Sequence, residues 1–185
     1  MSENSCISSR VERHFLERSG MEAMYGPEER IPAIVVSNFP ELGRLAALRF
    51  LEWVQDHPEG AVSLPTGKTP EYFIREVPRI LKTWEEPGTR SLLEEVGLEA
   101  GRKPRLDGLH FVQIDEFYPI NPLHHNSFAF YVRRFYLEGL GLDPQRALLI
   151  ECDRIGIPEG ATLEQIWSED EVDLSLRRRR AMDAR

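Results

Sequence analysis

The stretch that decides the fold is EGAVSLPTGKTPEYF, residues 59–73. It begins with AVSL (61–64), a short apolar run typical of a buried strand, which passes directly into a turn that contains glycine. Pro70 then suits the first turn of a helix, where its missing N–H costs nothing. Apolar side chains at helical spacing predict that this helix extends over 70–82. A strand, a tight turn and a helix in this order predict one unit of a parallel α/β sheet.

The turn includes Gly67-Lys68-Thr69, which resembles the end of a nucleotide-binding loop. The full pattern, G-x-x-x-x-G-K-[ST], requires a glycine five positions before Gly67. Val62 stands there instead, so the loop lacks the flexible first glycine that lets backbone N–H groups surround phosphates. The sequence therefore disfavours ATP or GTP binding.

Strand-like runs alternate with helical patterns along the rest of the chain. The predicted strands besides 61–64 are 31–36 (IPAIVV), 109–114 (LHFVQI) and 147–152 (ALLIEC). The predicted helices besides 70–82 are 10–18, 39–55, 91–100, 126–140 and 163–182. This alternation predicts a Rossmann-like α/β fold, a mainly parallel sheet with helices on both faces. We interpret residues 1–30 as a polar leader and 31–185 as the α/β domain.

Composition and charge argue against several classes of protein. Hydrophobic residues make up 41% and charged residues 29% of the chain, as in ordinary globular domains. The net charge of −8 argues against a general nucleic-acid partner, and no apolar run is long enough for a membrane helix. Two cysteines without a disulfide or metal-ligand pattern fit a cytoplasmic protein.

Two segments fall where a parallel sheet binds ligands, beyond the carboxyl ends of its strands. The turn at 66–69 offers backbone N–H groups at a helix start, with Lys68 nearby, which suits a phosphate or a sugar hydroxyl. The alternative is a plain strand-to-helix turn. Asp115-Glu116 follows the strand 109–114, where a carboxylate could move a proton beside a carbonyl. The alternative there is a solvated loop start or a helix cap.

Two other charged groups carry weaker signals. The spacing of His124-His125 does not suit a metal ion, so we interpret these as surface side chains, although His124 could lie over the site. Arg177–Arg180 follows an acidic run and is typical of a solvated helix face. We expect no metal and no cofactor.

LPTGKTP (64–70) followed by VQIDEFYPINPLHHNSFAFYVRRFY (112–136) resembles the glucosamine-6-phosphate deaminase (isomerase) family. The resemblance rests on the threonine–glycine loop, on Asp115-Glu116 at a strand end, and on His124 and Ser127 before an aromatic-rich helix. The related 6-phosphogluconolactonases share the fold but have serine-glycine-glycine where this chain has 65–67.

The resemblance implies roles for the candidate residues. Asp115 would be the proton acceptor between carbons 1 and 2 of the opened sugar, so that an aminosugar phosphate is interconverted with fructose 6-phosphate and ammonia. The remaining residues would bind the sugar phosphate: Thr66, Gly67, Lys68, Thr69, Glu116 and His124. A small-molecule partner is implied, and a homo-oligomer stays open.

The sequence also departs from the family pattern. Phe117 replaces the usual tyrosine, and Lys68 stands where the family often has a small residue. The glycine-rich segment ending in aspartate-glycine-histidine, which helps to open the sugar ring, is missing. We therefore expect the 185 residues to be the amino-terminal part of such a domain, inactive alone. The alternatives are a noncatalytic sugar-phosphate-binding module and a 6-phosphogluconolactonase-like hydrolase.

Overall fold

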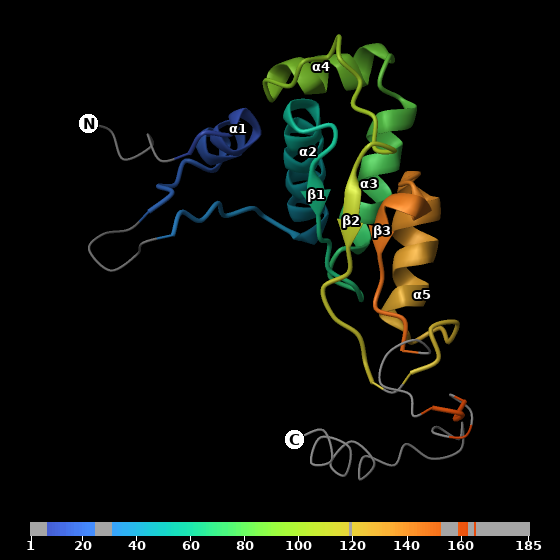
Figure 1. The fold of residues 1–185 in the computed structure, drawn as a ribbon. Coiled ribbons are helices and arrows are strands. Elements are labelled where there is room, and N and C mark those ends of the chain that lie inside the picture. Colours follow the sequence, from blue (N-terminus) through green and yellow to red (C-terminus); the bar gives the residue numbers. More distant parts are fainter. Residues whose placement is uncertain (1–6, 25–30, 119, 153–158, 163–164, 166–185) are drawn as a thin grey trace.

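A small parallel sheet lies at the centre of the chain (Figure 1). The computed structural model describes residues 7–24, 31–118, 120–152, 159–162 and 165. In these residues the strands are β1 (Ala61–Val62), β2 (His110–Val112) and β3 (Ala147–Leu148), in the order β1-β2-β3. Val62 pairs with Phe111, and Val112 pairs with Leu148. This arrangement confirms the predicted parallel α/β fold.

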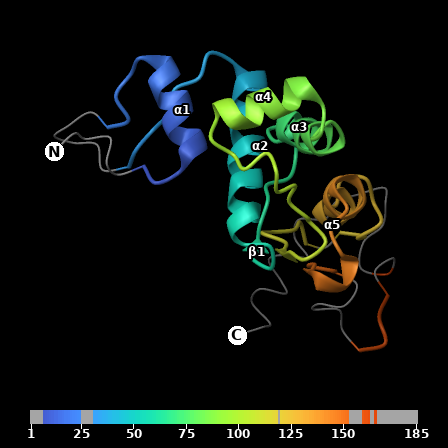
Figure 2. The same ribbon diagram turned by 90° about the horizontal axis from the view of Figure 1, so that it is seen from above.

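The helices gather on one face of the sheet (Figure 2). Phe111 of β2 points into that layer and is buried. Val112 and Leu148 are paired on the opposite face of the sheet, where they are 39% and 68% exposed. Within the described residues no second helical layer covers this other face. The helical elements are α1 (Arg10–Ser19), α2 (Phe39–Asp56), α3 (Glu71–Lys82), α4 (Pro87–Glu95), α5 (Phe128–Val132), the π-helix η2 (Arg133–Glu138) that continues α5, and the 3₁₀-helix η3 (Pro144–Arg146).

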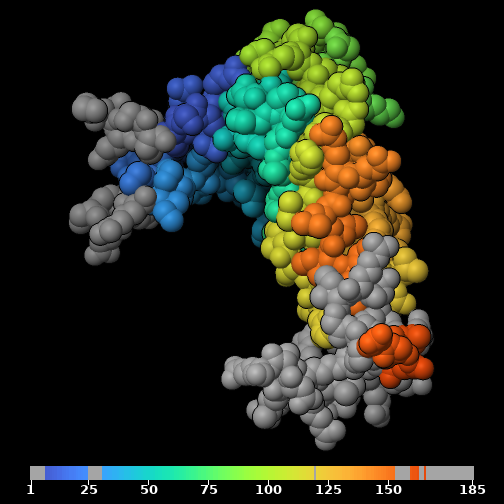
Figure 3. Space-filling model, in the orientation of Figure 1, coloured from blue at the N-terminus to red at the C-terminus, as the bar shows by residue number. Residues whose placement is uncertain are grey.

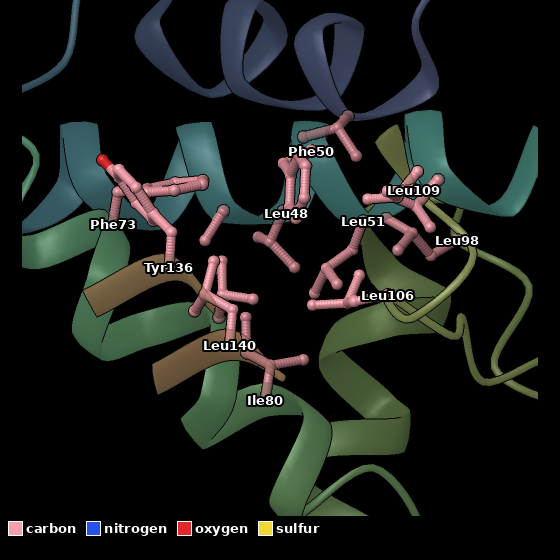
Figure 4. Close-up of a cluster of buried hydrophobic side chains, with 14 of the residues drawn as sticks. Leu48, Phe50, Leu51, Phe73, Ile80, Leu98, Leu106, Leu109, Tyr136 and Leu140 are labelled. Atoms are coloured by element: carbon pink, nitrogen blue, oxygen red, sulfur yellow. The ribbon is translucent and has the colours of Figure 1, made fainter. Parts of the chain in front are cut away.

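The hydrophobic core fills the space between β2 and the helices (Figure 4). Its side chains come from α2, α3, η2 and the segments around β2, among them Leu48, Leu51, Ile80, Leu109 and Tyr136. The helices α2 and α3 approach closely at Gly43, where an added Cβ would lie 2.3 Å from the Cβ of Tyr72. The core therefore fixes α3, and with it the turn that precedes α3.

The predicted leader contributes α1, which packs beside α2 (Figure 3). Val11 and Phe15 are buried in the common core. Glu52 of α2 is 4% exposed and accepts hydrogen bonds from Ser9 Oγ at 2.5 Å and from the N–H of Arg10 at 2.7 Å. A buried carboxylate is stable only when it is paired in this way.

The prediction of a strand over 31–36 is wrong. These residues are extended but form no strand, and Ile31 is 81% exposed. The N–H of Ala33 bonds to the carbonyl of Ala23, and Ile34 packs against the small cluster of Ile7, Leu16 and Ala23. Ile34 and Val36 also pack against the main core, whereas Val35 is 50% exposed. The run is thus attached to the helical part of the fold by single side chains, and it pairs with no described strand.

Other boundaries shift for local reasons. The helix predicted at 91–100 forms at Pro87–Glu95, since Pro87 occupies the first turn and Gly97 has φ +79° just beyond the end. The strand predicted at 147–152 is two residues long. The helix predicted over 163–182, with Arg177–Arg180, lies outside the described residues.

Candidate functional site

The turn after β1 has the conformation that an anion-binding loop needs at a helix start. Gly67 has φ +90°, in the left-handed region that favours glycine. The N–H of Glu71 bonds to the carbonyl of Lys68 at 3.2 Å, and Pro70, the N-cap residue of α3, makes no side-chain capping bond in the described structure. Lys68 and Thr69 are exposed and Thr66 is half-buried. The positive end of α3 and a lysine therefore meet at an accessible surface.

Asp115 lies beyond the end of β2, and its side chain is exposed. No described residue donates a hydrogen bond to its carboxylate. Its main chain, in contrast, is held by Gln113, which is 5% exposed. The Nε2 of Gln113 donates to the carbonyl of Asp115 at 2.8 Å, and its Oε1 accepts from the N–H of Ile150 at 3.0 Å. Gln113 thus fixes the backbone of Asp115 against the chain that follows β3.

Glu116 is engaged with the first turn of α5. Its Oε1 accepts from the N–H of Phe128 at 2.9 Å, and its Oε2 accepts from the N–H of Ala129 at 2.8 Å. The hydroxyl of Ser127 donates to Oε2 at 2.7 Å, and the N–H of Phe117 donates to Oε1 at 2.9 Å. A carboxylate at this position satisfies N–H groups that the helix leaves free. Glu116 therefore attaches the end of β2 to α5.

Two tyrosines on the same helical segment hold the turn at 65–67. The hydroxyl of Tyr131 donates to the carbonyl of Gly67 at 2.7 Å, and the hydroxyl of Tyr136 donates to the carbonyl of Pro65. Burial raises the pKa of Tyr131, with a smaller effect of Glu71. Burial likewise raises the pKa of Tyr136, with a smaller effect of Tyr131. Both hydroxyls therefore keep their protons and remain hydrogen-bond donors.

The two predicted segments share one edge of the sheet. β1 and β2 are neighbouring parallel strands, so 65–69 and 113–116 both follow carboxyl ends at the same edge. The Ser63 hydroxyl joins the two strands there by donating to the carbonyl of Val112 at 2.7 Å. A cation, free N–H groups and a carboxylate at one edge suit the binding of a small anion and the transfer of a proton.

His124 belongs to the turn before α5. Its Nδ1 accepts from the N–H of Asn126 at 3.2 Å, and its carbonyl accepts from the N–H of Ser127 at 2.8 Å. Its ring lies 4.3 Å, centroid to centroid, from that of His125. These contacts place His124 in the turn, and none of them brings it to the loop at 66–69.

Two further features flank the site. A mainly apolar groove of about 660 Å³ lies beside β1, and Pro65 and Thr69 form part of its wall, but Asp115 does not line it. Cys152 is 2% exposed, and its Sγ lies 3.3 Å from the carbonyl of Phe117.

In the described parts of the chain, no three His, Cys, Asp or Glu side chains come together as a metal site would require. No helix in those parts is long and apolar enough to cross a membrane.

The sequence interpretation missed Gln113, Tyr131 and Tyr136. Gln113 had a detectable signal, because it is the polar member on the buried side of an otherwise apolar alternation in LHFVQI. The tyrosines had none, because their contacts depend on the helical geometry between them.

Comparison with known proteins gives a likeness in fold. No family model and no curated protein matches the chain. A solved structure described as a monomeric glucosamine-6-phosphate deaminase of the NagB superfamily matches with a TM-score of 0.51 and 18% identity, over 80% of this chain and 48% of that one. This chain thus spans about half the length of that structure. The comparison shows that this chain and that structure share a similar fold.

Proposed function

We propose that the chain binds a sugar phosphate at the edge formed by 65–69 and 113–116, and that Asp115 moves a proton on the bound sugar. The substrate that the resemblance and the fold neighbour favour is glucosamine 6-phosphate, whose deamination yields fructose 6-phosphate and ammonia. One observation carries this proposal: the turn and Asp115 follow neighbouring parallel strands, and the turn and Glu116, the residue after Asp115, bond to the same helical segment.

The phosphate would lie at the start of α3. Free N–H groups and the helix dipole favour an anion there, and Lys68 adds a positive charge. Thr66 and Thr69 offer hydroxyls from the same turn, and Gly67 lets the backbone approach the ligand. We assign Glu116 a positioning role, because its oxygens already bond to α5.

The chemistry assigned to Asp115 is a proton transfer between two carbons. Its carboxylate takes the proton from carbon 2 of the open-chain aminosugar, the electrons of that C–H bond form the double bond between carbons 1 and 2, and the carbonyl oxygen takes a proton from water to give an enol-amine. Asp115 then returns its proton to carbon 1 while the nitrogen loses one proton to water, which leaves an imine at carbon 2. Water then adds to the imine carbon and ammonia departs, so that a ketone remains. One carboxylate suffices for both proton transfers at carbon.

The test follows ammonia release and deuterium incorporation at carbon 1 of fructose 6-phosphate in D₂O. For a longer protein that contains these residues together with the missing glycine-rich segment, we expect both, and a loss of at least about 100-fold in Asp115→Asn, because general-base catalysis contributes about that factor or more. Glu138→Gln, an exposed carboxylate on η2, serves as the control and should retain the rate. Undiminished turnover in Asp115→Asn would exclude the role given to that residue.

A second candidate is a noncatalytic module that binds a sugar phosphate. It is favoured by the exposure of Asp115, whose carboxylate has no described hydrogen-bond donor to fix it. Titration with glucosamine 6-phosphate, followed by NMR of the amides at 66–69, separates the candidates. Binding that Lys68→Ala weakens, without turnover in the longer protein that contains these residues, supports the module. If neither glucosamine 6-phosphate nor inorganic phosphate binds, both candidate functions are contradicted.

A further inference from the structure

The helical segment from Phe128 to Glu138 changes its geometry midway. It begins as α5, and from Arg133 it continues as the π-helix η2. π-Helical turns bond residue i to residue i+5, which widens the turn; they are rare and recur at functional sites. This one begins between Tyr131, in α5, and Tyr136, in η2. These are the two residues whose hydroxyls reach the loop.

The wider turn explains how both tyrosines reach one loop. In an α-helix of 3.6 residues per turn, side chains five residues apart point about 140° away from each other. A π-helical turn is wider, with bonds from residue i to residue i+5, so side chains five apart point in more similar directions. The rings of Tyr131 and Tyr136 accordingly meet edge to face, with centroids 6.0 Å apart. Their hydroxyls bond to Gly67 and Pro65 respectively.

We propose that the continuous segment of α5 and η2 positions the anion loop. Through Tyr131 of α5 and Tyr136 of η2 it holds the carbonyls of Gly67 and Pro65 on the side of the helix, which leaves the N–H groups of 66–69 free to face a ligand. These tyrosines are positioning residues, and they do not touch the reacting atoms. The part of this proposal that concerns a bound anion rests on the proposed function.

The same helix also fixes the other half of the site. Its first turn donates two N–H groups to Glu116, one residue after Asp115, and one turn later Tyr131 donates to Gly67. The distance between the loop and Asp115 is therefore set through one rigid segment. A change at either contact would move one half of the site relative to the other.

Amide hydrogen exchange of the ligand-free chain tests the positioning role directly. We expect Tyr131→Phe and Tyr136→Phe each to raise the exchange rate of the Glu71 amide, whose bond to the carbonyl of Lys68 closes the turn, about three- to tenfold, the factor that one net hydrogen bond supplies. Amides in α2 should keep their rates. Tyr72→Phe removes a hydroxyl from the neighbouring helix α3 and is the matched control, with no expected change at the Glu71 amide.

Binding of inorganic phosphate provides the second readout. Both variants should raise its dissociation constant by a similar factor, and the Tyr72→Phe control should not. Unchanged exchange of the Glu71 amide, or an equal rise throughout the chain, would overturn the positioning role. If the unmodified chain binds neither phosphate nor glucosamine 6-phosphate, the proposed function fails, whereas the exchange rates still decide whether the tyrosines order the loop.

Discussion

Asp115 and Glu116 are neighbours, but their carboxylates have different surroundings. Asp115 is exposed, with only its main chain fixed by Gln113. Glu116 accepts hydrogen bonds from the N–H groups of Phe128 and Ala129 and from the Ser127 hydroxyl. At the scale of the residue, one carboxylate is available to a ligand and the other serves the fold.

Replacing Glu116 by Gln should destabilise the protein. The amide turns one acceptor oxygen into a donor that faces N–H groups of α5, so we expect the free energy of unfolding to fall by about 1–3 kcal/mol. Urea denaturation followed by circular dichroism measures this. Asp115→Asn is the matched control, since an exposed carboxylate without described donors should change stability by less than about 0.5 kcal/mol. Equal losses in the two variants would contradict the structural role of Glu116.

At the scale of the element, α3 is placed by its contact with α2. Gly43 lets the two helices approach until an added Cβ would lie 2.3 Å from the Cβ of Tyr72 and 2.9 Å from the N of Phe73. Neither atom is the end of a flexible side chain. Because the loop at 66–69 leads directly into α3, this helix crossing also places the candidate anion site.

Gly43→Ala should therefore separate α2 from α3. We expect a loss of about 1–3 kcal/mol in the free energy of unfolding, as for other overpacked contacts. Gly88→Ala, in α4, has open space around the added Cβ and should be neutral or slightly stabilising. Thermal unfolding of both variants measures the difference, and similar melting temperatures would argue against the close crossing.

The stability of the fold should depend on pH through an ion pair on α3. The hydrogen bond from Arg79 lowers the pKa of Glu76, with further help from the charges of Arg79 and Arg44. Because the pKa of Glu76 is lower in the folded than in the unfolded chain, its carboxylate stabilises the fold at pH values above the unfolded pKa, near 4.5. This stability is lost as the pH falls through the folded-state pKa. We expect Glu76→Gln to cost less than about 1 kcal/mol at neutral pH, because Arg79 is half exposed and water screens the pair.

Comparing urea denaturation of Glu76→Gln and the unmodified chain at pH 7 and pH 3 measures this effect. The difference in the free energy of unfolding should shrink at the lower pH, where the carboxylate becomes protonated. A difference that grows on acidification would contradict the direction of the pKa change.

At the scale of the whole molecule, α1 is attached to the rest through Glu52. Its buried carboxylate accepts from Ser9 and from the N–H of Arg10, and Arg49 lies 3.6 Å away. Glu52→Ala should cost about 2 kcal/mol, in the range for hydrogen bonds to a charged group, and α1 should lose protection against amide exchange before the sheet does. Glu17→Ala, exposed on α1, is the control. Retained protection of α1 in Glu52→Ala would contradict this attachment.

The parallel fold could be predicted because its signals are local. The strand, glycine turn and Pro70 in residues 59–73 specify a βα unit by themselves, and the strand before Asp115 adds a second one. The run 31–36 has equally strong β-propensity, but it forms no strand, because propensity cannot tell which partner the run will meet.

The candidate site could be predicted only in outline. The positions of 66–69 and Asp115 follow from strand ends, which a sequence pattern locates. The use of Glu116 as a helix anchor follows from where α5 begins, and this depends on tertiary packing. The contacts of Tyr131 and Tyr136 need a π-turn, whereas periodicity predicts a continuous α-helix over 126–140.

The thiol of Cys152 is buried next to the carbonyl of Phe117, so its rate of chemical labelling can report motion at the sheet edge. Alkylation requires the thiol to reach solvent, so its rate measures how often the segment after Asp115 opens. In a Cys6→Ser background a single reactive sulfur remains. Slower labelling with added sugar phosphate would register occupancy without any assay of turnover.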